Sequence, residues 1–224
     1  MNSRPTLLAA HASDAMPQLA TYHWLLVALL ALLLLSGCAT PPVPTQEQAP
    51  SDWAQRQQAL SHLENWRISG KLGVRQGDRL DSAVINNWTQ RGEEFDINLS
   101  SAVFGLGATN LRGTPQAIWL TQSGEEPLYS DRPEALIYQQ TGWTLPIESL
   151  FSWIKGIPAP ATVTESAFDL SGRLYELQQL GWTIRYTDYH ATEPYPLPRK
   201  ILLEREGVRV TLVINDWQLD TPSR

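Results

Sequence analysis

The feature that most constrains the fold is an alternation of apolar and polar side chains that recurs along the chain. In WRISGKLGVR (residues 66–75) and FDINL (residues 95–99), every second position is apolar or glycine. A period of two places successive side chains on opposite faces of a strand, so both stretches predict strands with one buried face. Further strands are predicted at residues 80–90, 109–113, 116–122, 173–180, 182–189, 199–205 and 208–215, with Glu206-Gly207 as a tight hairpin turn.

Two short helices are predicted where this alternation stops, between residues 130 and 156. Ser130 or Asp131 can cap the first helix, and Pro146 fits the first position of the second. The second helix carries an apolar stripe with the spacing of one helix face, formed by Ile147, Leu150, Phe151 and Ile154. Another helix is predicted to begin at Asp52, as an acidic cap with a glutamine three residues on.

The order of these elements indicates a mainly β, α+β fold. Strands follow the first helix, then come the pair of helices and a second run of strands, with no regular exchange of strand and helix. Such an order favours a strongly curved antiparallel sheet, or an incomplete β-barrel, with helices over its concave face.

The N-terminus indicates export and lipid attachment. Residues 24–35 (WLLVALLALLLL) are an uncharged apolar run that is too short to span a bilayer and has the length of a signal-peptide core. The following Leu-Ser-Gly-Cys, ending at Cys38, resembles the bacterial lipobox. This resemblance implies that residues 1–37 are removed and that Cys38 is acylated, and Ala39 implies sorting to the outer membrane. Met1 and Met16 both remain as translation starts.

The rest of the chain divides into a tether and one domain. Residues 38–50 are rich in proline and polar residues, which predicts a flexible tether from the acylated Cys38. Residues 51–224 have a length suited to a single domain with a sizeable core. The eight tryptophans that follow Cys38 are explained either as core filling or as the walls of an apolar cavity, and the sequence does not separate the two.

Composition and motifs exclude several classes of function. A net charge of −6 argues against a nucleic-acid footprint, and a single cysteine allows neither a disulfide nor a cysteine-based metal site. Ser152 and Lys155 match S-x-x-K, but the companion motifs of penicillin-binding proteins are absent, so we regard the match as coincidence. His62 and His190 have no second ligand at a suitable spacing. We therefore expect no catalytic site, no metal and no cofactor.

One predicted loop is unusually apolar. The stretch SAVFGLGATNLR joins two predicted strands, and Val103, Phe104 and Leu106 stand where polar turn residues are usual. These side chains either fold back as core or remain outside, where they can enter a membrane or contact an apolar partner.

Taken in order, the motifs resemble the LolB family. The resemblance is carried by the lipobox, the strand WRISGKLGVR, the loop with Leu106-Gly107, the segment SLFSWIKGIP and the closing Asn215-Asp216-Trp217. It extends over nearly all of the chain after Cys38. LolB proteins are outer-membrane lipoproteins that receive other lipoproteins from the periplasmic carrier LolA and insert them into the outer membrane.

The resemblance implies an incomplete barrel with a helical lid around an apolar cavity for acyl chains, and a protruding loop whose exposed leucine, matched by Leu106, is needed for insertion. It implies a chain anchored by Cys38 at the periplasmic face of a Gram-negative outer membrane, with a LolA-like carrier, triacylated cargo lipoproteins and outer-membrane phospholipid as partners. We expect a monomer. The candidate cavity and lid residues are Trp66, Phe95, Ile97, Leu99, Trp119, Ile147, Leu150, Phe151, Ile154, Trp182 and Ile184.

Two other classes of function stay open at this point. A structural or assembly-accessory lipoprotein would have a filled core and no exchangeable ligand. An envelope enzyme, such as a peptidoglycan hydrolase, would need paired carboxylates or a nucleophile with its base, and the sequence offers no such pattern.

Overall fold

The computed structural model describes residues 45–101 and 107–219, and in them one antiparallel sheet dominates. Three helices are present in this part of the chain: α2 (Trp53–Ser61), α3 (Pro133–Thr141) and α4 (Ile147–Trp153). The strands are β1 (Thr45–Gln46), β2 (Asn65–Gln76), β3 (Arg79–Arg91), β4 (Glu94–Ser101), β5 (Gly107–Thr114), β6 (Ala117–Gln122), β7 (Leu128–Ser130), β8 (Val163–Asp169), β9 (Leu174–Gln179), β10 (Trp182–His190), β11 (Leu197–Arg205) and β12 (Val208–Leu219).

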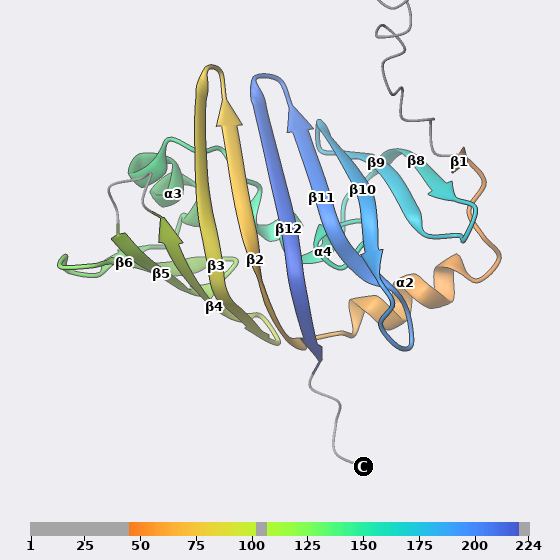
Figure 1. Ribbon diagram of the computed structural model, residues 1–224, viewed down its shortest axis with the longest axis horizontal. Helices are drawn as coiled ribbons and strands as arrows, with labels where there is room; N and C mark the ends of the chain where they lie inside the picture. Colours follow the sequence, from red (N-terminus) through yellow and green to blue (C-terminus); the bar gives the residue numbers. More distant parts are fainter. Residues whose placement is uncertain (1–44, 102–106, 220–224) are drawn as a thin grey trace, which may run out of the picture. The chain divides into compact units, whose positions relative to one another are not determined.

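Two meanders of sequential hairpins make up the sheet. The strand order is β1-β8-β9-β10-β11-β12-β2-β3-β4-β5-β6-β7, so the meanders β2–β7 and β8–β12 meet where β12 pairs with β2. That central pair runs from Val208 opposite Gln76 to Leu219 opposite Trp66. Within the described residues, the end strands β1 and β7 each pair on one side only, so the sheet is open. The predicted curved antiparallel sheet is confirmed (Figure 1).

Irregular pairing occurs in the central strands of the sheet. Register shifts interrupt the β12–β2, β2–β3 and β3–β4 pairs, and such bulges bend and twist a strand. Gly70 lies beside two of these shifts, and a Cβ atom at this position would lie 2.1 Å from the carbonyl oxygen of Val213. Only glycine therefore lets β2 and β12 approach each other this closely.

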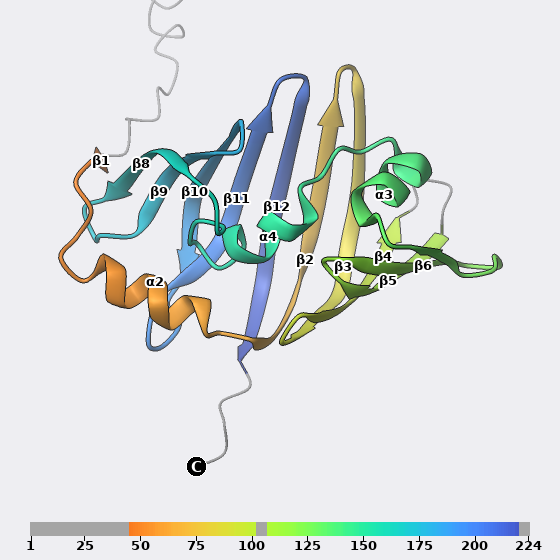
Figure 2. The same ribbon diagram turned by 180° about the vertical axis from the view of Figure 1, so that it is seen from behind.

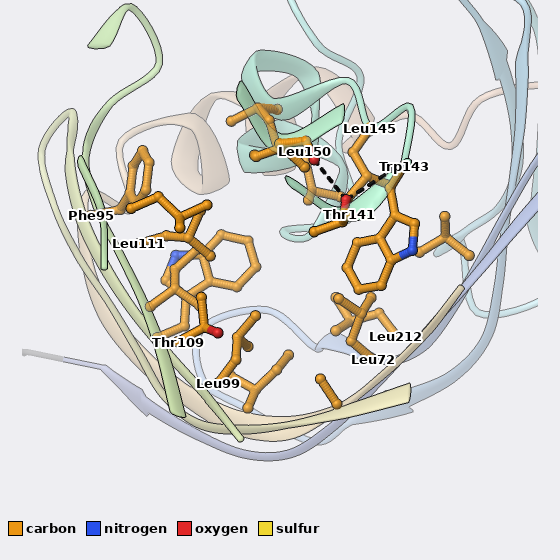
Figure 3. Close-up of a pocket in the computed structure, with 18 of the residues that line it drawn as sticks. Leu72, Phe95, Leu99, Thr109, Leu111, Thr141, Trp143, Leu145, Leu150 and Leu212 are labelled. Atoms are coloured by element: carbon orange, nitrogen blue, oxygen red, sulfur yellow. Dashed lines mark hydrogen bonds between the residues drawn. The ribbon is translucent and has the colours of Figure 1, made fainter. Parts of the chain in front are cut away.

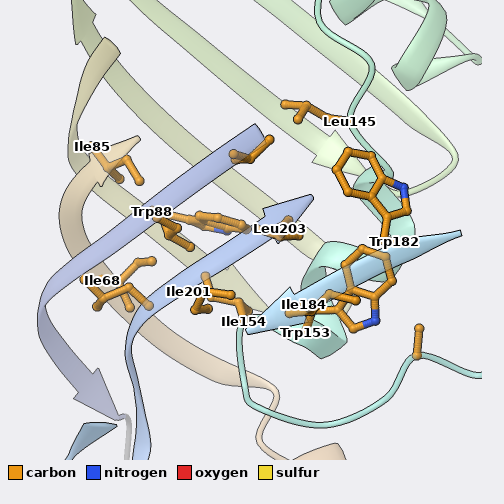
Figure 4. Packing of buried hydrophobic residues seen from close by; sticks show 14 of the residues in the cluster. Ile68, Ile85, Trp88, Leu145, Trp153, Ile154, Trp182, Ile184, Ile201 and Leu203 are labelled. Carbon is orange, nitrogen blue, oxygen red and sulfur yellow. The ribbon is translucent and has the colours of Figure 1, made fainter. Parts of the chain in front are cut away.

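All three helices lie over one face of the sheet, the concave one (Figures 1 and 2). The buried positions of β2, β3 and β6 alternate with exposed ones, which is why this face is apolar and needs cover. Figure 4 shows the core under α4, where Trp153 and Ile154 meet Ile184 and Ile201. These side chains are at most 1 % exposed, and burial of each contributes about 1.5–3 kcal/mol.

The helix ends differ from the predicted caps. Asp52 precedes α2 without a side-chain cap, because its carboxylate pairs with Arg56 at 3.1 Å instead. Arg132, and not Ser130 or Asp131, directly precedes α3, and the Ser130 hydroxyl accepts the Arg132 N–H. Pro146 precedes α4 rather than forming its first residue.

Three short or irregular strands extend the sheet beyond the prediction. Thr45 and Gln46, predicted within the tether, form β1 and pair with Asp169 and Phe168 of β8. Strands β7 and β8 were not predicted at all. Residues 1–37, Cys38 and the loop residues Val103, Phe104 and Leu106 lie outside the described residues. None of the helices in the described part of the chain has the length and apolar character needed to cross a membrane.

Candidate functional site

An apolar cavity of about 110 Å³ lies between the concave face of the sheet and the helices (Figure 3). Strands β2 to β6 and β10 to β12 form its floor and walls, and α3, α4 and the segment between them form its cover. In Figure 3, Leu99 and Leu212 approach from the sheet, while Leu145 and Leu150 approach from the cover. No charged residue of the described chain lines this space. Its walls therefore suit hydrocarbon.

The cover, which we call the lid (residues 133–153), is fixed firmly at the end of α4. The buried amide of Gln179 accepts hydrogen bonds from Trp153 Nε1 at 2.8 Å and from the Ala159 N–H at 2.9 Å. It donates to the carbonyls of Ala159 at 2.9 Å and Ala161 at 2.8 Å. The Tyr186 hydroxyl donates to the Trp153 carbonyl at 2.9 Å. The side-chain amide of Gln179 and the hydroxyl of Tyr186 are thus paired, and such a satisfied buried network makes this end of the lid the more rigid one.

A polar cluster within the described residues ties the other part of the lid to the sheet. Trp143, in the segment after α3, donates from Nε1 to Asp81 Oδ2 at 3.1 Å. Arg79 Nε lies 2.7 Å from the same carboxylate oxygen, and Arg79 Nη1 donates to the Thr141 carbonyl at 3.3 Å. We call this group, Arg79, Asp81 and Trp143, the lid latch. Because Trp143 also lines the cavity, the latch holds a lid side chain over the apolar space.

The structure brings six of the predicted site residues to the cavity. They are Phe95, Ile97, Leu99, Ile147, Leu150 and Trp182. Four others pack beside the cavity without lining it: Trp66, Phe151, Ile154 and Ile184. Phe151 supports the wall from behind, because its ring centroid lies 5.2 Å from that of Phe95.

Trp119 lies on the other face of the sheet, which corrects its expected place in the cavity wall. Its neighbours Ile118 and Leu120 point inward, so alternation along β6 turns Trp119 outward. The side chain is 43 % exposed and packs against Tyr129 of β7, with ring centroids 5.0 Å apart.

Comparison with known proteins identifies the family. The sequence profile described as outer membrane lipoprotein LolB matches residues 64–217, which is most of the chain and includes nearly all of the cavity-forming sheet. The chain belongs to the LolB family. The resemblance stated from the motifs is thereby confirmed.

Individual LolB relatives match over most of their length. An outer-membrane lipoprotein LolB of Marinobacter nauticus is 40% identical over 191 residues, covering 82% of this chain and 92% of the relative. One of Nitrosococcus oceani is 40% identical over 195 residues, covering 86% and 96%. A solved domain of Vibrio parahaemolyticus, assigned to outer membrane lipoprotein sorting, has a TM-score of 0.51 at 11% identity and covers 76% of this chain and 92% of its own. At this identity the likeness concerns the fold alone.

Several cavity residues of this LolB chain were not predicted. Leu72 and Leu212 lie on predicted strands, at positions whose side chains alternate onto the inner face of the sheet. The alternation could therefore have predicted them as lining residues. Trp143 and Leu145 lie in the irregular segment between α3 and α4, where no periodicity marks a buried face. Only their apolar character within the predicted lid could have indicated them.

The S-x-x-K match has a structural explanation. Lys155 Nζ donates to the carbonyls of Ser61 at 3.2 Å and Leu63 at 3.4 Å, at the end of α2. Burial lowers the pKa of Lys155, and nearby Glu64 acts in the opposite direction. The side chain thus joins the end of the lid to α2. Within residues 45–101 and 107–219, no cluster of histidine, cysteine and carboxylate side chains is arranged to hold a metal ion.

Proposed function

We propose that this protein is an outer-membrane lipoprotein receptor that accepts triacylated lipoproteins from a LolA-like periplasmic carrier and inserts them into the inner leaflet of the outer membrane. The observation that carries the proposal is the apolar cavity under the lid, in a chain of the LolB family. Acyl chains are the part of a lipoprotein that such a cavity can bind, because burial of each methylene contributes about 0.8 kcal/mol.

Binding of whole acyl chains requires the lid to move. The enclosed space is about 110 Å³, smaller than an engineered cavity of about 150 Å³ that holds one benzene molecule. An acyl chain of a lipoprotein is several times larger than benzene. The lid latch is the contact to be broken, since the opposite end is held by Gln179 and Tyr186. Opening at the latch enlarges the cavity while α4 stays attached.

Transfer proceeds down a gradient of affinity. The cavity lining offers no charged group, and nothing in the described site suggests a source of chemical energy. Acyl chains leave the carrier for a cavity that binds them more tightly, and then leave that cavity for the bilayer. A difference of about 1.4 kcal/mol favours each step tenfold.

Anchoring and insertion involve residues beyond the described part of the chain. We propose that Cys38 carries the acyl groups that hold the protein at the membrane, because two or more chains give stable attachment where one does not. The apolar loop residues Val103, Phe104 and Leu106 then act at the bilayer surface, where released acyl chains enter the membrane. Three such side chains are too few to anchor the protein but enough to insert reversibly.

The test is a transfer experiment with purified components. Carrier loaded with a triacylated lipoprotein is mixed with residues 39–224 of this protein, and the cargo bound to each is separated and quantified. We expect most of the cargo to move to this protein. A Leu150→Glu variant, which places a carboxylate in the cavity wall, should accept little. A folded protein that takes no cargo from an active carrier would contradict the proposal and favour a structural lipoprotein.

A further inference from the structure

A few polar side chains interrupt the apolar lining of the cavity. Three polar side chains of the described residues line it: Thr109 on β5, Gln122 on β6 and Thr141 at the end of α3. The Thr141 hydroxyl is engaged within the lid, since it donates to the Ile137 carbonyl at 2.7 Å and accepts the Trp143 N–H at 3.0 Å. Thr109 and Gln122 are direct partners in the β5–β6 register, so their side chains share one face of the sheet. In Figure 3 the Thr109 side chain faces the space under the lid.

Gln122 is the unusual member of this pair. Every second side chain of β6 points to the inner face of the sheet, so the Gln122 side chain lies on the same face as those of Ile118 and Leu120. It is only 6 % exposed. The Nε2 atom is buried and has no hydrogen-bond partner among the residues that the structure describes. A buried amide without a partner destabilises a folded protein, because the hydrogen bonds to water are lost and not replaced. A glutamine in an otherwise apolar wall is therefore explained best by a partner that arrives with a ligand.

The chemistry of that partner follows from the donor and from the walls. An amide N–H₂ needs an acceptor oxygen, and the remaining walls need hydrocarbon. The carbonyl of an ester-linked acyl chain supplies both, since the acceptor lies at the head of a long apolar tail. An alkyl ether of the same length supplies the tail without the carbonyl.

We propose that Gln122, with Thr109 beside it, binds the ester carbonyl of an acyl chain in the cavity and so fixes the direction in which the chain lies. The inference rests on the proposed function. Across the cavity, the lining residues of β10 to β12 are Trp182, Leu203, Val210 and Leu212. The ester end therefore lies against β5 and β6, and the tail extends toward β10. Cargo lipoproteins and phospholipids both carry this ester chemistry.

The test uses the whole acylated chain in nanodiscs of dialkyl ether phospholipid, so that the phospholipid offers no ester and the esters of the Cys38 anchor are the same in every variant. A diazirine-bearing alkane labels the cavity under light, and competitors displace it. The competitors form two matched pairs, a diacylglyceryl-cysteine peptide with its dialkyl analogue and a diacyl phosphatidylethanolamine with its dialkyl analogue. The measured quantity is the concentration of each that halves the labelling.

We expect each ester to compete at about fivefold lower concentration than its ether, as for the gain of one hydrogen bond. In Gln122→Met, which keeps the length of the side chain, this preference should disappear, while Thr121→Met on the outer face of β6 should keep it. A preference in only one pair would identify the source of the ester. An equal ester preference in Gln122→Met would overturn the inference and leave the acyl-binding function standing, whereas a failure of all four competitors to displace the label would overturn both.

Two further measurements test whether Gln122, and not another group, binds the ester carbonyl. Trp88 also lines the cavity, and its buried indole Nε1 has no hydrogen-bond partner within residues 45–101 and 107–219, so it is the competing donor. Loss of the ester preference in Trp88→Phe but not in Gln122→Met would overturn the assignment to Gln122.

In the absence of competitor and label, Gln122→Met should raise the Tm by a few degrees, because an unpartnered amide is removed. A fall in Tm would show that the amide is already paired without a ligand and would overturn the proposal.

Discussion

The indole of Trp143 donates a hydrogen bond to the carboxylate of Asp81, with 3.1 Å between Nε1 and Oδ2, and both side chains are buried. Trp143 belongs to the lid and Asp81 to β3, so the bond joins two parts of the chain that must separate when the cavity opens. A hydrogen bond to a charged acceptor contributes about 1.5–3 kcal/mol, enough to keep the lid closed without preventing its opening.

The first prediction concerns this bond. Trp143→Phe keeps an aromatic ring against the cavity and removes the N–H donor. We expect acyl chains to enter and leave several-fold faster, because the closed lid loses one contact with the sheet, and the Tm to fall by a few degrees. Stopped-flow fluorescence with a labelled fatty acid measures the exchange rates.

Trp153→Phe is the matched control for that experiment. It also removes an indole donor to a buried side chain, Gln179, but at the fixed end of α4. It should lower the Tm without changing the exchange rates. If both variants accelerated exchange equally, the effect would reflect general loosening and the latch would lose its special role.

The second prediction fills the cavity. Ala83 is a small, buried lining residue on β3, and Ala83→Leu adds three carbon atoms to a space of about 110 Å³. We expect the free energy of unfolding to rise by about 1 kcal/mol, since a void is filled, and acyl binding to weaken about tenfold or more. Calorimetry and titration with a fatty acid measure the two effects.

Ala117→Leu on the outward face of β6 adds the same group away from the cavity and should leave binding unchanged. Unweakened binding in the Ala83 variant would indicate that acyl chains bind elsewhere.

The alternation of side chains predicted most of the sheet because it reports directly which face of a strand is buried. It predicted β2 and β4 well, but it gave no signal for the three-residue β7 or for β8, whose sequence VTESAFD has no apolar period although Phe168 is buried. Trp119 was assigned to the wrong face of the sheet because AIWLTQ (residues 117–122) has apolar residues at both even and odd positions. Only the register with β5 decides which of these two sets faces the core. A single sequence cannot make that choice.

The lid shows a second limit. The stripe on α4 correctly predicted an apolar helix face, but it did not show that Ile147 and Leu150 line the cavity while Ile154 packs in the solid core. That division depends on how α4 crosses the sheet. Asp81, by contrast, alternates onto the same inner face of β3 as Ala83 and Ile85. The strand pattern alone could therefore have predicted that its carboxylate is buried.

The third prediction concerns alkaline pH. Burial raises the pKa of Tyr186 well above its ordinary value of 10.0, and burial followed by the charge of Asp169 raises that of Tyr189. The unfolded chain therefore loses these two protons first as the pH rises. Stability from both tyrosines is complete below pH 10 and is lost above it, by about 1.4 kcal/mol per pH unit for each.

Denaturant unfolding between about pH 11 and 12 measures this slope, because Lys155, with its lowered pKa, is then mostly deprotonated in both the folded and the unfolded chain. Tyr186→Phe should remove about half of the slope. An unchanged slope in this variant would assign the alkaline instability to other groups.

The fourth prediction concerns the apolar loop. Phe104→Glu combined with Leu106→Glu replaces two apolar side chains by charges that resist entry into the bilayer. We expect cargo to pass normally from the carrier to this protein and then to remain bound to it, because only the membrane step is affected. Recovery of cargo in outer-membrane vesicles measures insertion. Normal insertion by the double variant would exclude a role of the loop.

The last prediction concerns Gln179, which holds the fixed end of the lid. Gln179→Leu keeps the approximate volume but removes the hydrogen-bond partner of the Trp153 indole N–H, the Ala159 N–H and the Ala161 carbonyl, while the Ala159 carbonyl still accepts the Ala161 N–H at 2.7 Å. Each unpaired buried group costs about 1–3 kcal/mol, so the free energy of unfolding should fall by about 3 kcal/mol or more. Gln178→Leu, next to it on β9 and bonded only at the surface to Glu165, should cost less than about 1 kcal/mol. Equal losses in the two variants would contradict the assignment of Gln179 as the support from which the lid opens.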